Sequence, residues 1–366
     1  MDSLDNHYMA RALRLAERGQ FTTSPNPRVG CILVKEGEEI ASGWHQVAGG
    51  PHAEILALEQ AGDKAKGATC YVSLEPCSHI GRTGPCSQAL IEAGVSRVVY
   101  GMEDPNPKVQ GEGVEKLRAA GIEVEGPLMA KEAAQINAGY VKRMTTGRPL
   151  VRLKMAMSLD ARTAMPDGNA FWITGPKARA DVQKLRARSC AVLSGWKSVA
   201  LDKSQMTVRP EEFDLDVEYL GQRQPLRILL DAKLQMPSDA RFFKAESPIL
   251  VANLSREGTG DLSHVRYLKV AENNEHIDLE ALLDQLGAEQ INDLLIESGA
   301  TLAGAFMRAG LVDELIIYVA PKLMGSEARA LFDIPLQKMA ESLPLHIQEI
   351  RQLGGDIRIT AKLEKE

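Results

Sequence analysis

The strongest constraint on the fold is a set of metal-binding side chains that come from separate segments. Residues 51–54 read PHAE, and residues 74–86 read LEPCSHIGRTGPC. Zinc prefers nitrogen and sulfur donors, and a catalytic zinc site has three protein ligands and one water. We therefore expect His52, Cys77 and Cys86 to converge on one zinc ion. The fold must bring two helix starts and one strand end to the same point.

The order of these residues matches the zinc deaminase signature H-x-E followed by P-C-x-x-C, but eight residues separate the two cysteines here. In that signature a glutamate that is not a ligand transfers protons, which assigns the catalytic role to Glu54. We expect Pro51 and Pro85 at the first positions of two helices, whose N-termini favour the thiolate form of Cys86. The alternative is a structural zinc site with His79 as the fourth ligand.

The composition argues against nucleic-acid and membrane partners. The formal net charge is −6 and aromatic residues make up 5%, whereas nucleic-acid-binding surfaces are basic and use aromatic side chains for stacking. No run of about 18 apolar residues is present, and we expect a cytoplasmic enzyme, where disulfides are rare. Cys31, Cys70 and Cys190 are therefore interpreted as small buried apolar residues.

The chain reads as two α/β halves joined by the segment TTGRP at residues 145–149. The first half alternates strand and helix patterns, which is typical of a three-layer α/β sandwich. The second half restarts with a strand at 151–157 and ends in a hairpin around a Gly-Gly turn, within residues 346–363. Two domains suit a chain of 366 residues. We expect the domains at residues 1–146 and 149–366.

Nearly the whole chain resembles one known family. The stretches TTSPNPRVGCILV, GWHQVAGGPHAE, LEPCSHIGRTGPC and EDPNPKVQGEG resemble the deaminase domain of the bacterial bifunctional riboflavin-biosynthesis proteins. The stretches LKMAMSLDARTA, WITGPKARADVQKLRA, MTVRP and ESGATLAGAFMRAGLVDELIIYVAPKLMG resemble the reductase domain of the same proteins. The resemblance implies a cytidine-deaminase-like domain with zinc, followed by a dihydrofolate-reductase-like domain with NADPH.

The resemblance also implies two consecutive reactions. The first is deamination of 2,5-diamino-6-ribosylamino-4(3H)-pyrimidinone 5′-phosphate, and the second is NADPH-dependent reduction of the ribosyl group, giving 5-amino-6-ribitylaminouracil 5′-phosphate. The implied partner is a small phosphorylated pyrimidine, and we expect a homo-oligomer, either a dimer or a tetramer. Two alternatives stay open: a nucleic-acid deaminase with an unrelated second domain, and a second domain that binds nucleotide without turnover.

Site residues follow from the resemblance position by position. Arg82 suits a phosphate because a guanidinium binds phosphate through two parallel hydrogen bonds. The implied substrate contacts of the deaminase are Asn26, His45, His79 and Arg82. The implied substrate contacts of the reductase are Lys154, Ala170, Thr174, Arg186, Met206, Arg209 and Glu297. The implied NADPH contacts are Ala156, Trp172, Ser198, Asp202, Gly299, Ala300, Thr301, Leu302, Ala303, Gly304 and Ala305.

Four positions in the reductase half depart from the family pattern. Ala161 stands where the family has glycine, and Ala170 stands where serine is frequent. Lys203 and Ser204 replace an acid and a proline. The loss of proline removes a fixed φ from this loop, and the exchange of an acid for a lysine changes its charge by two units. We therefore expect a slower reductase or altered substrate binding.

Overall fold

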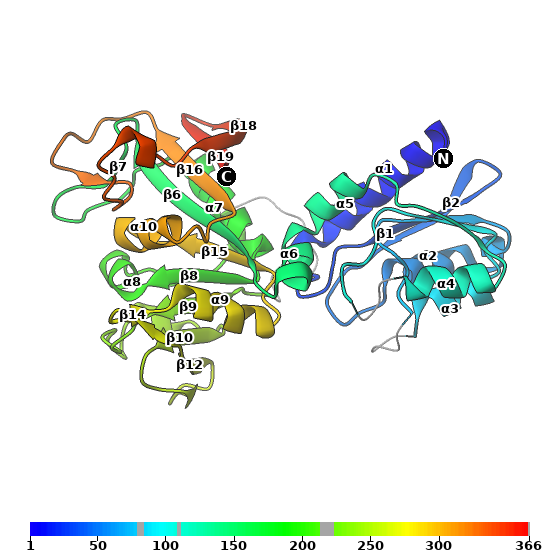
Figure 1. The fold of residues 1–366 in the computed structure, drawn as a ribbon, viewed down its shortest axis with the longest axis horizontal. Coiled ribbons are helices and arrows are strands. Elements are labelled where there is room, and N and C mark those ends of the chain that lie inside the picture. Colours follow the sequence, from blue (N-terminus) through cyan, green and yellow to red (C-terminus); the bar gives the residue numbers. More distant parts are fainter. Residues whose placement is uncertain (79–83, 108–110, 213–222, 365–366) are drawn as a thin grey trace. The chain divides into compact units, whose positions relative to one another are not determined.

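The computed structural model describes residues 1–78, 84–107, 111–212 and 223–364 (Figure 1). The chain divides into two compact units, Met1–Gly147 and Arg148–Glu366. Each unit has its own central sheet and its own buried clusters of apolar side chains. Among the helices of the described ranges, none is long and apolar enough to cross a membrane.

The first unit is built on a five-stranded sheet. Its strands are β1 (Gly30–Lys35), β2 (Glu38–Trp44), β3 (Thr69–Val72), β4 (Arg97–Tyr100) and β5 (Glu123–Glu125). Their order is β2-β1-β3-β4-β5. β1 pairs antiparallel with β2 and β3, whereas β3, β4 and β5 run parallel. Parallel neighbours require crossover connections, and the helices in the two crossovers here pack on one face of the sheet.

Helices cover both faces of this sheet. They are α1 (Ser3–Glu17), α2 (Ala53–Ala61), α3 (Cys86–Glu92), α4 (Glu112–Ala119), α5 (Ala130–Ile136) and α6 (Ala138–Thr146), with 3-10 turns η1 (Arg18–Phe21) and η2 (Gly62–Ala65). Side chains alternate along β1, so Ile32 and Val34 pack with α1 and α5. Cys31 and Leu33 pack with α2, α3 and α4 on the opposite face. The result is the three-layer sandwich that the sequence predicts.

The second unit is built on a ten-stranded sheet in the order β11-β12-β10-β9-β8-β15-β6-β16-β19-β18. These strands are β6 (Leu150–Ser158), β8 (Ala191–Gly195), β9 (Leu226–Leu230), β10 (Ile249–Asn253), β11 (Gly258–Thr259), β12 (Val265–Lys269), β15 (Asp293–Glu297), β16 (Glu314–Ala320), β18 (Leu345–Leu353) and β19 (Asp356–Leu363). The seven strands from β12 to β16 run parallel. β18 and β19 form the predicted C-terminal hairpin.

Smaller elements complete the second unit. They are helices α7 (Pro176–Arg188), α8 (Trp196–Asp202), α9 (Leu279–Ala288) and α10 (Ala300–Arg308), strand pairs β7 (Arg162–Ala164) with β17 (Arg329–Ala330) and β13 (Glu272–Asn273) with β14 (His276–Ile277), and 3-10 turns η3 (Pro210–Glu212), η5 (Arg241–Lys244) and η6 (Met339–Glu341). α7 and η5 pack on one face of the sheet. α9 and α10 pack on the other. Ligands of such sheets bind beyond the carboxyl ends of the parallel strands.

Candidate active sites

Three elements of the first unit bring the predicted metal ligands together. His52 is the N-cap of α2, Cys77 follows β3, and Cys86 is the first residue of α3. The His52 Nδ1 atom lies 3.1 Å from Cys86 Sγ and 3.6 Å from Cys77 Sγ. All three donor atoms lie within 4.8 Å of one another. Tetrahedral zinc, with bonds of about 2.0 Å to nitrogen and 2.3 Å to sulfur, separates its ligands by roughly 3.5 Å, so this donor set fits zinc.

The prediction for the two prolines is wrong by one or two positions. α2 begins at Ala53 after an extended His52 (ψ 162°), so Pro51 precedes the N-cap. Pro85 is the N-cap of α3 and is also extended (ψ 131°). Cys86 nevertheless stands at a helix start, and its backbone N–H donates to Cys77 Sγ at 3.4 Å. This N–H at the start of α3 therefore stabilises negative charge on Cys77.

The protonation of the cluster suits metal binding and proton transfer. A hydrogen bond from the Cys86 thiol lowers the pKa of Cys77, which favours its thiolate form. The same thiolate raises the pKa of His52 by hydrogen bonding. Burial raises the pKa of Glu54 to about 7, and this side chain is only 3% exposed. A carboxyl group whose pKa lies near neutrality is suited to general acid–base catalysis.

His45 and Asn26 lie next to this cluster. The His45 ring centroid is 5.6 Å from that of His52. Its Nδ1 is 2.9 Å from the Pro51 carbonyl oxygen and its Nε2 is 3.1 Å from Asn26 Nδ2. The carbonyl can only accept, so Nδ1 carries the proton and Nε2 accepts from the Asn26 amide. Burial lowers the pKa of His45, which keeps the ring neutral.

Two of the predicted substrate contacts cannot be placed, and one buried acid near the site was not predicted. His79 and Arg82 lie outside the described residues. Sequence reasoning gave no role to Asp104, which is buried and accepts hydrogen bonds from the Tyr140 hydroxyl and the Asn106 backbone N–H, both at 2.9 Å. The sequence signal for Asp104 was its place in the EDPNP stretch. A buried acid needs hydrogen-bond donors around it, and the Tyr140 hydroxyl and the Asn106 N–H supply them.

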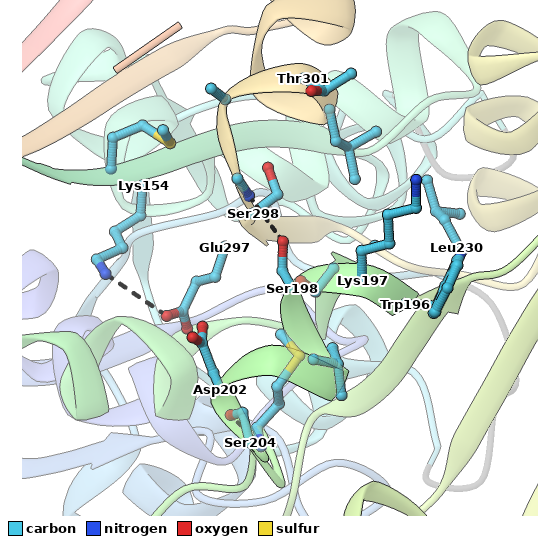
Figure 2. A pocket seen from close by; sticks show the side chains of 18 of the residues that line it. Lys154, Trp196, Lys197, Ser198, Asp202, Ser204, Leu230, Glu297, Ser298 and Thr301 are labelled. Carbon is cyan, nitrogen blue, oxygen red and sulfur yellow. Dashed lines mark hydrogen bonds and ion pairs between the residues drawn. The ribbon is translucent and has the colours of Figure 1, made fainter. Parts of the chain in front are cut away.

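The second unit contains a cavity of about 1900 Å³. Figure 2 shows it at the carboxyl ends of β8 and β15, between the starts of α8 and α10. The predicted reductase residues that line it are Lys154, Ala156, Ala170, Trp172, Thr174, Arg186, Ser198, Asp202, Met206, Arg209, Glu297, Gly299, Ala300, Thr301, Leu302 and Ala305. Ala303 and Gly304 are not lining residues: Ala303 is buried in the core, and Gly304 packs against the Asp333 carbonyl oxygen.

A cluster of charged side chains lines this cavity. The Glu297 carboxylate accepts from Arg186 Nε at 2.6 Å and from Arg186 Nη2 at 3.1 Å, and Lys154 Nζ is 3.8 Å away (Figure 2). Burial lowers the pKa of Lys154, while the negative charge of Glu297 opposes that change. Burial raises the pKa of Asp202. The cavity thus holds cations and carboxyl groups whose protonation depends on one another.

The start of α10 has the features that a dinucleotide phosphate needs. Gly299 is its N-cap, and the Gly299 N–H donates to Ser198 Oγ at 3.1 Å. A Cβ atom at Gly299 would lie 3.2 Å from that hydroxyl oxygen, so glycine permits close approach. The free N–H groups and positive dipole end of a helix start favour a phosphate. Trp172 is 60% exposed and offers a flat apolar surface.

Several residues that line this cavity were not predicted from the sequence. Trp196, Lys197 and Leu230 lie together at one end of it (Figure 2). The pair β13 and β14 adds Asn273 and His276. Each of these two strands has only two residues, which is too short for any periodicity to be read from the sequence.

Fold and site together define the class of protein: a zinc-type deaminase domain followed by a nucleotide-dependent reductase domain. Residues 2–102 match the family described as the cytidine and deoxycytidylate deaminase zinc-binding region. Residues 149–359 match the family of RibD C-terminal domains.

The similarity to known proteins extends over nearly the whole chain. The riboflavin biosynthesis protein RibD of Escherichia coli (strain K12) is 50% identical over 358 residues, which cover 96% of this chain and 98% of the relative. The Haemophilus influenzae protein of the same name is 49% identical and covers 98% of this chain and 97% of its own. A solved structure of Acinetobacter baumannii RibD has a TM-score of 0.93 at 44% identity and covers 99% of both chains.

A fourth relative carries a description of its reactions. The Thermotoga maritima structure is described as a diaminohydroxyphosphoribosylaminopyrimidine deaminase/5-amino-6-(5-phosphoribosylamino)uracil reductase. It has a TM-score of 0.87 at 32% identity and covers 98% of this chain and 99% of its own. The present chain belongs to the RibD family of riboflavin biosynthesis proteins, and it is a bifunctional deaminase and reductase. The predicted fold class, pair of activities and cofactors, zinc and NADPH, are confirmed.

Proposed function

We propose that the first unit deaminates 2,5-diamino-6-ribosylamino-4(3H)-pyrimidinone 5′-phosphate and that the second reduces the ribosyl group of the product to ribityl. The observation that carries this proposal is the His52, Cys77 and Cys86 cluster with the buried Glu54 beside it, in one chain with the reductase cavity. The description of the Thermotoga maritima relative supports the same pair of reactions. We assign the two activities to residues 1–146 and 149–366.

In the deaminase, His52, Cys77 and Cys86 would hold zinc, which when bound lowers the pKa of a water molecule toward neutrality. Glu54 would take one proton from the water and give it to the pyrimidine ring nitrogen. It would then transfer the second proton of the water to the amino group, which leaves as ammonia. Because the amide of Asn26 donates to the neutral His45 ring, its carbonyl oxygen is free to accept a hydrogen bond from the pyrimidine. Hydrolysis consumes one water and releases one ammonia.

In the reductase, NADPH supplies a hydride when it is bound, and the chain supplies binding and protons. The start of α10 and Ser198 would hold the diphosphate. Lys154, Arg186 and Glu297 orient the polar ribosyl chain through hydrogen bonds. The ammonium of Lys154, whose pKa burial lowers, and the carboxyl of Asp202, whose pKa burial raises, are the groups suited to proton donation.

The phosphate contact, the assembly and the location are also proposals. Arg82 would bind the substrate phosphate, and this part rests on sequence alone. A homodimer or tetramer is supported by β18, which is an edge strand of the ten-stranded sheet. Two of its apolar side chains are exposed, Ile347 (52%) and Ile350 (64%), and such an edge can pair with another chain. A cytoplasmic location agrees with the five free cysteines. Light scattering on the purified chain tests the assembly, and a monomer at all concentrations would refute it.

The decisive experiment measures both reactions on the full chain, with and without a change at Glu54. Glu54→Gln removes the carboxylate but no ligand, so zinc content should stay at one per chain. Ammonia release should fall by about 10²–10⁴-fold, the usual contribution of a general acid–base group. NADPH oxidation with the already deaminated substrate should be unchanged. The matched control is Glu59→Gln on the exposed side of the same helix, and undiminished ammonia release in Glu54→Gln would disprove the assigned role.

A further inference from the structure

The first turn of α4 packs directly against the chain segment that carries the zinc ligand Cys77. Gly113 is the contact point: a Cβ atom there would lie 1.8 Å from the Pro76 carbonyl oxygen. That oxygen belongs to the peptide group that leads into Cys77. No side chain larger than a hydrogen atom fits between them, so the helix backbone sets the position of this peptide.

The residue after Cys77 is held by the same helix. The Ser78 hydroxyl donates to Glu112 Oε2 at 2.7 Å, and Lys116 Nζ donates to the Ser78 carbonyl oxygen at 3.0 Å. Glu112 and Lys116 are four residues apart and therefore project from one side of the helix. Ser78 is 4% exposed. One helix face thus fixes the chain on both sides of Cys77.

A third contact comes from Glu75, two residues before Cys77. The N-cap of α4 is Gly111, which has no side chain to cap the helix. Glu75 is only 2% exposed, and its Oε2 accepts from the Asp104 backbone N–H at 3.3 Å. Its other oxygen, Oε1, has no hydrogen-bond partner among the described residues and lies beside α4, because a Cβ atom at Gly113 would be 3.7 Å from it.

On its other side Cys77 contacts α3. The Cys77 carbonyl oxygen accepts from the Ser87 N–H at 3.1 Å, and its Sγ accepts from the Cys86 N–H at 3.4 Å. These bonds join two parts of the zinc site to one another but do not anchor either part to a distant element. The contacts with α4 supply that anchor, since α4 follows Cys77 by more than thirty residues.

We propose that Glu112, Gly113 and Lys116 are positioning residues for the zinc site, which hold the Cys77 thiolate where His52 and Cys86 can share a metal with it. This inference rests on the zinc-dependent deaminase function. None of the three residues is a metal ligand. Contacts that orient a ligand from outside the coordination sphere typically account for about 10–100-fold in metal affinity or activity.

The test measures zinc affinity of the full chain by competition with a chelator. Ser78→Ala, Glu112→Gln and Lys116→Met should each weaken zinc binding, and the double variant Glu112→Gln with Lys116→Met should approach the 10–100-fold range. The matched control is Glu115→Gln, an exposed position on the same helix that should bind zinc as tightly as wild type. NADPH oxidation on the deaminated substrate reports whether the second unit stays intact in every variant.

A second readout separates positioning from general weakening of the fold. Cobalt(II) in place of zinc gives an absorption spectrum that depends on ligand geometry, and the three variants should change it while Glu115→Gln does not. Gly113→Ala should have the largest effect; if it fails to fold, Ser78→Ala, which removes one hydroxyl, still decides the question. Wild-type zinc affinity and an unchanged cobalt spectrum in all three single variants would overturn the inference. A wild-type chain that binds no zinc would instead overturn the proposed deaminase mechanism.

Discussion

Replacing Glu297 with glutamine tests how the charges in the reductase cavity stabilise one another. Glu297 accepts from Arg186 at 2.6 and 3.1 Å and lies 3.8 Å from Lys154 Nζ. The side chains of these three residues are 12%, 11% and 17% exposed. Glutamine keeps the shape and removes the charge, so the two cations lose the carboxylate between them. Removing one partner of a buried pair costs about 3–5 kcal/mol, and we expect about 3 kcal/mol because water enters the cavity.

Calorimetric unfolding of the full chain measures this cost. For a unit of 150–250 residues, each 1 kcal/mol shifts the midpoint by about 2–4 °C. The reductase transition of Glu297→Gln should therefore fall by roughly 6–12 °C, and the deaminase transition should not move. The control is Glu289→Gln, which breaks the more exposed pair with Arg266 (28% and 46% exposed) and should cost less than about 1 kcal/mol. Equal shifts in the two variants would refute the reasoning.

The same change should alter the pH dependence of reduction. The negative charge of Glu297 raises the pKa of Lys154 against the lowering effect of burial. Without that charge Lys154 loses its proton at a lower pH. If the protonated lysine is required, the alkaline limb of the NADPH oxidation profile moves to lower pH in Glu297→Gln, and an unmoved limb would exclude Lys154 as the titrating group.

Two further predictions concern stability. Ala161 has a φ of +58°, a conformation that costs an L-residue about 1–2 kcal/mol. Glycine avoids that cost but loses about 0.5–1 kcal/mol more backbone entropy on folding. Ala161→Gly should therefore stabilise the reductase unit by up to about 1 kcal/mol, and a lower denaturation midpoint would contradict this. The Arg97 guanidinium holds the pKa of Asp5 well below its usual range by hydrogen bonding. That contribution is fully present above about pH 4, the unfolded value, and is lost as the pH falls through the lower folded value. Arg97→Met should flatten the acid side of the deaminase stability curve, measured by urea midpoints, and parallel curves would show the pair to be unimportant.

The zinc site could be predicted from the sequence because its signal is local chemistry. Histidine and cysteine at this spacing have few uses besides metal binding, and a glutamate two residues after the histidine has a defined role. The helix boundaries next to these ligands could not be predicted to the residue. Both prolines lie before the first helical residue, because the backbone of His52 is extended ahead of α2 and the backbone of Pro85 is extended ahead of α3.

The contacts that hold the sites could not be predicted, because they join residues far apart in the sequence. Nothing local to Ser78 indicates that its hydroxyl donates to Glu112, and nothing local to Gly113 indicates the Pro76 carbonyl oxygen against it. Lys154 and Glu297 meet only because β6 and β15 are parallel neighbours that pair these two residues in register. Such pairings depend on the strand order, which a single sequence does not reveal.

The loop at Lys203 and Ser204, where the sequence departs from the family pattern, has a defined conformation. Lys203 has a left-handed φ of +48° and ends α8. Its N–H donates to the Ala200 carbonyl oxygen at 3.4 Å, and the Ser204 N–H donates to the Val199 carbonyl oxygen at 3.2 Å. A proline at position 204 would lack that donor and would disfavour a helical conformation in the residue before it. This loop is therefore a capped helix end, a different conformation from one that a proline would fix.

A side chain distant in the sequence contacts this loop. Arg227 is completely buried, and its guanidinium donates to the Gln205 carbonyl oxygen at 3.0 Å. It also donates to the carbonyl oxygens of Phe242 and Ser247, at 2.6 and 2.7 Å. A buried guanidinium is costly to desolvate, so these carbonyl oxygens are held firmly around it. Arg227 thus connects the backbone next to Met206, a residue that lines the cavity, to β9 and to the segment at 242–247.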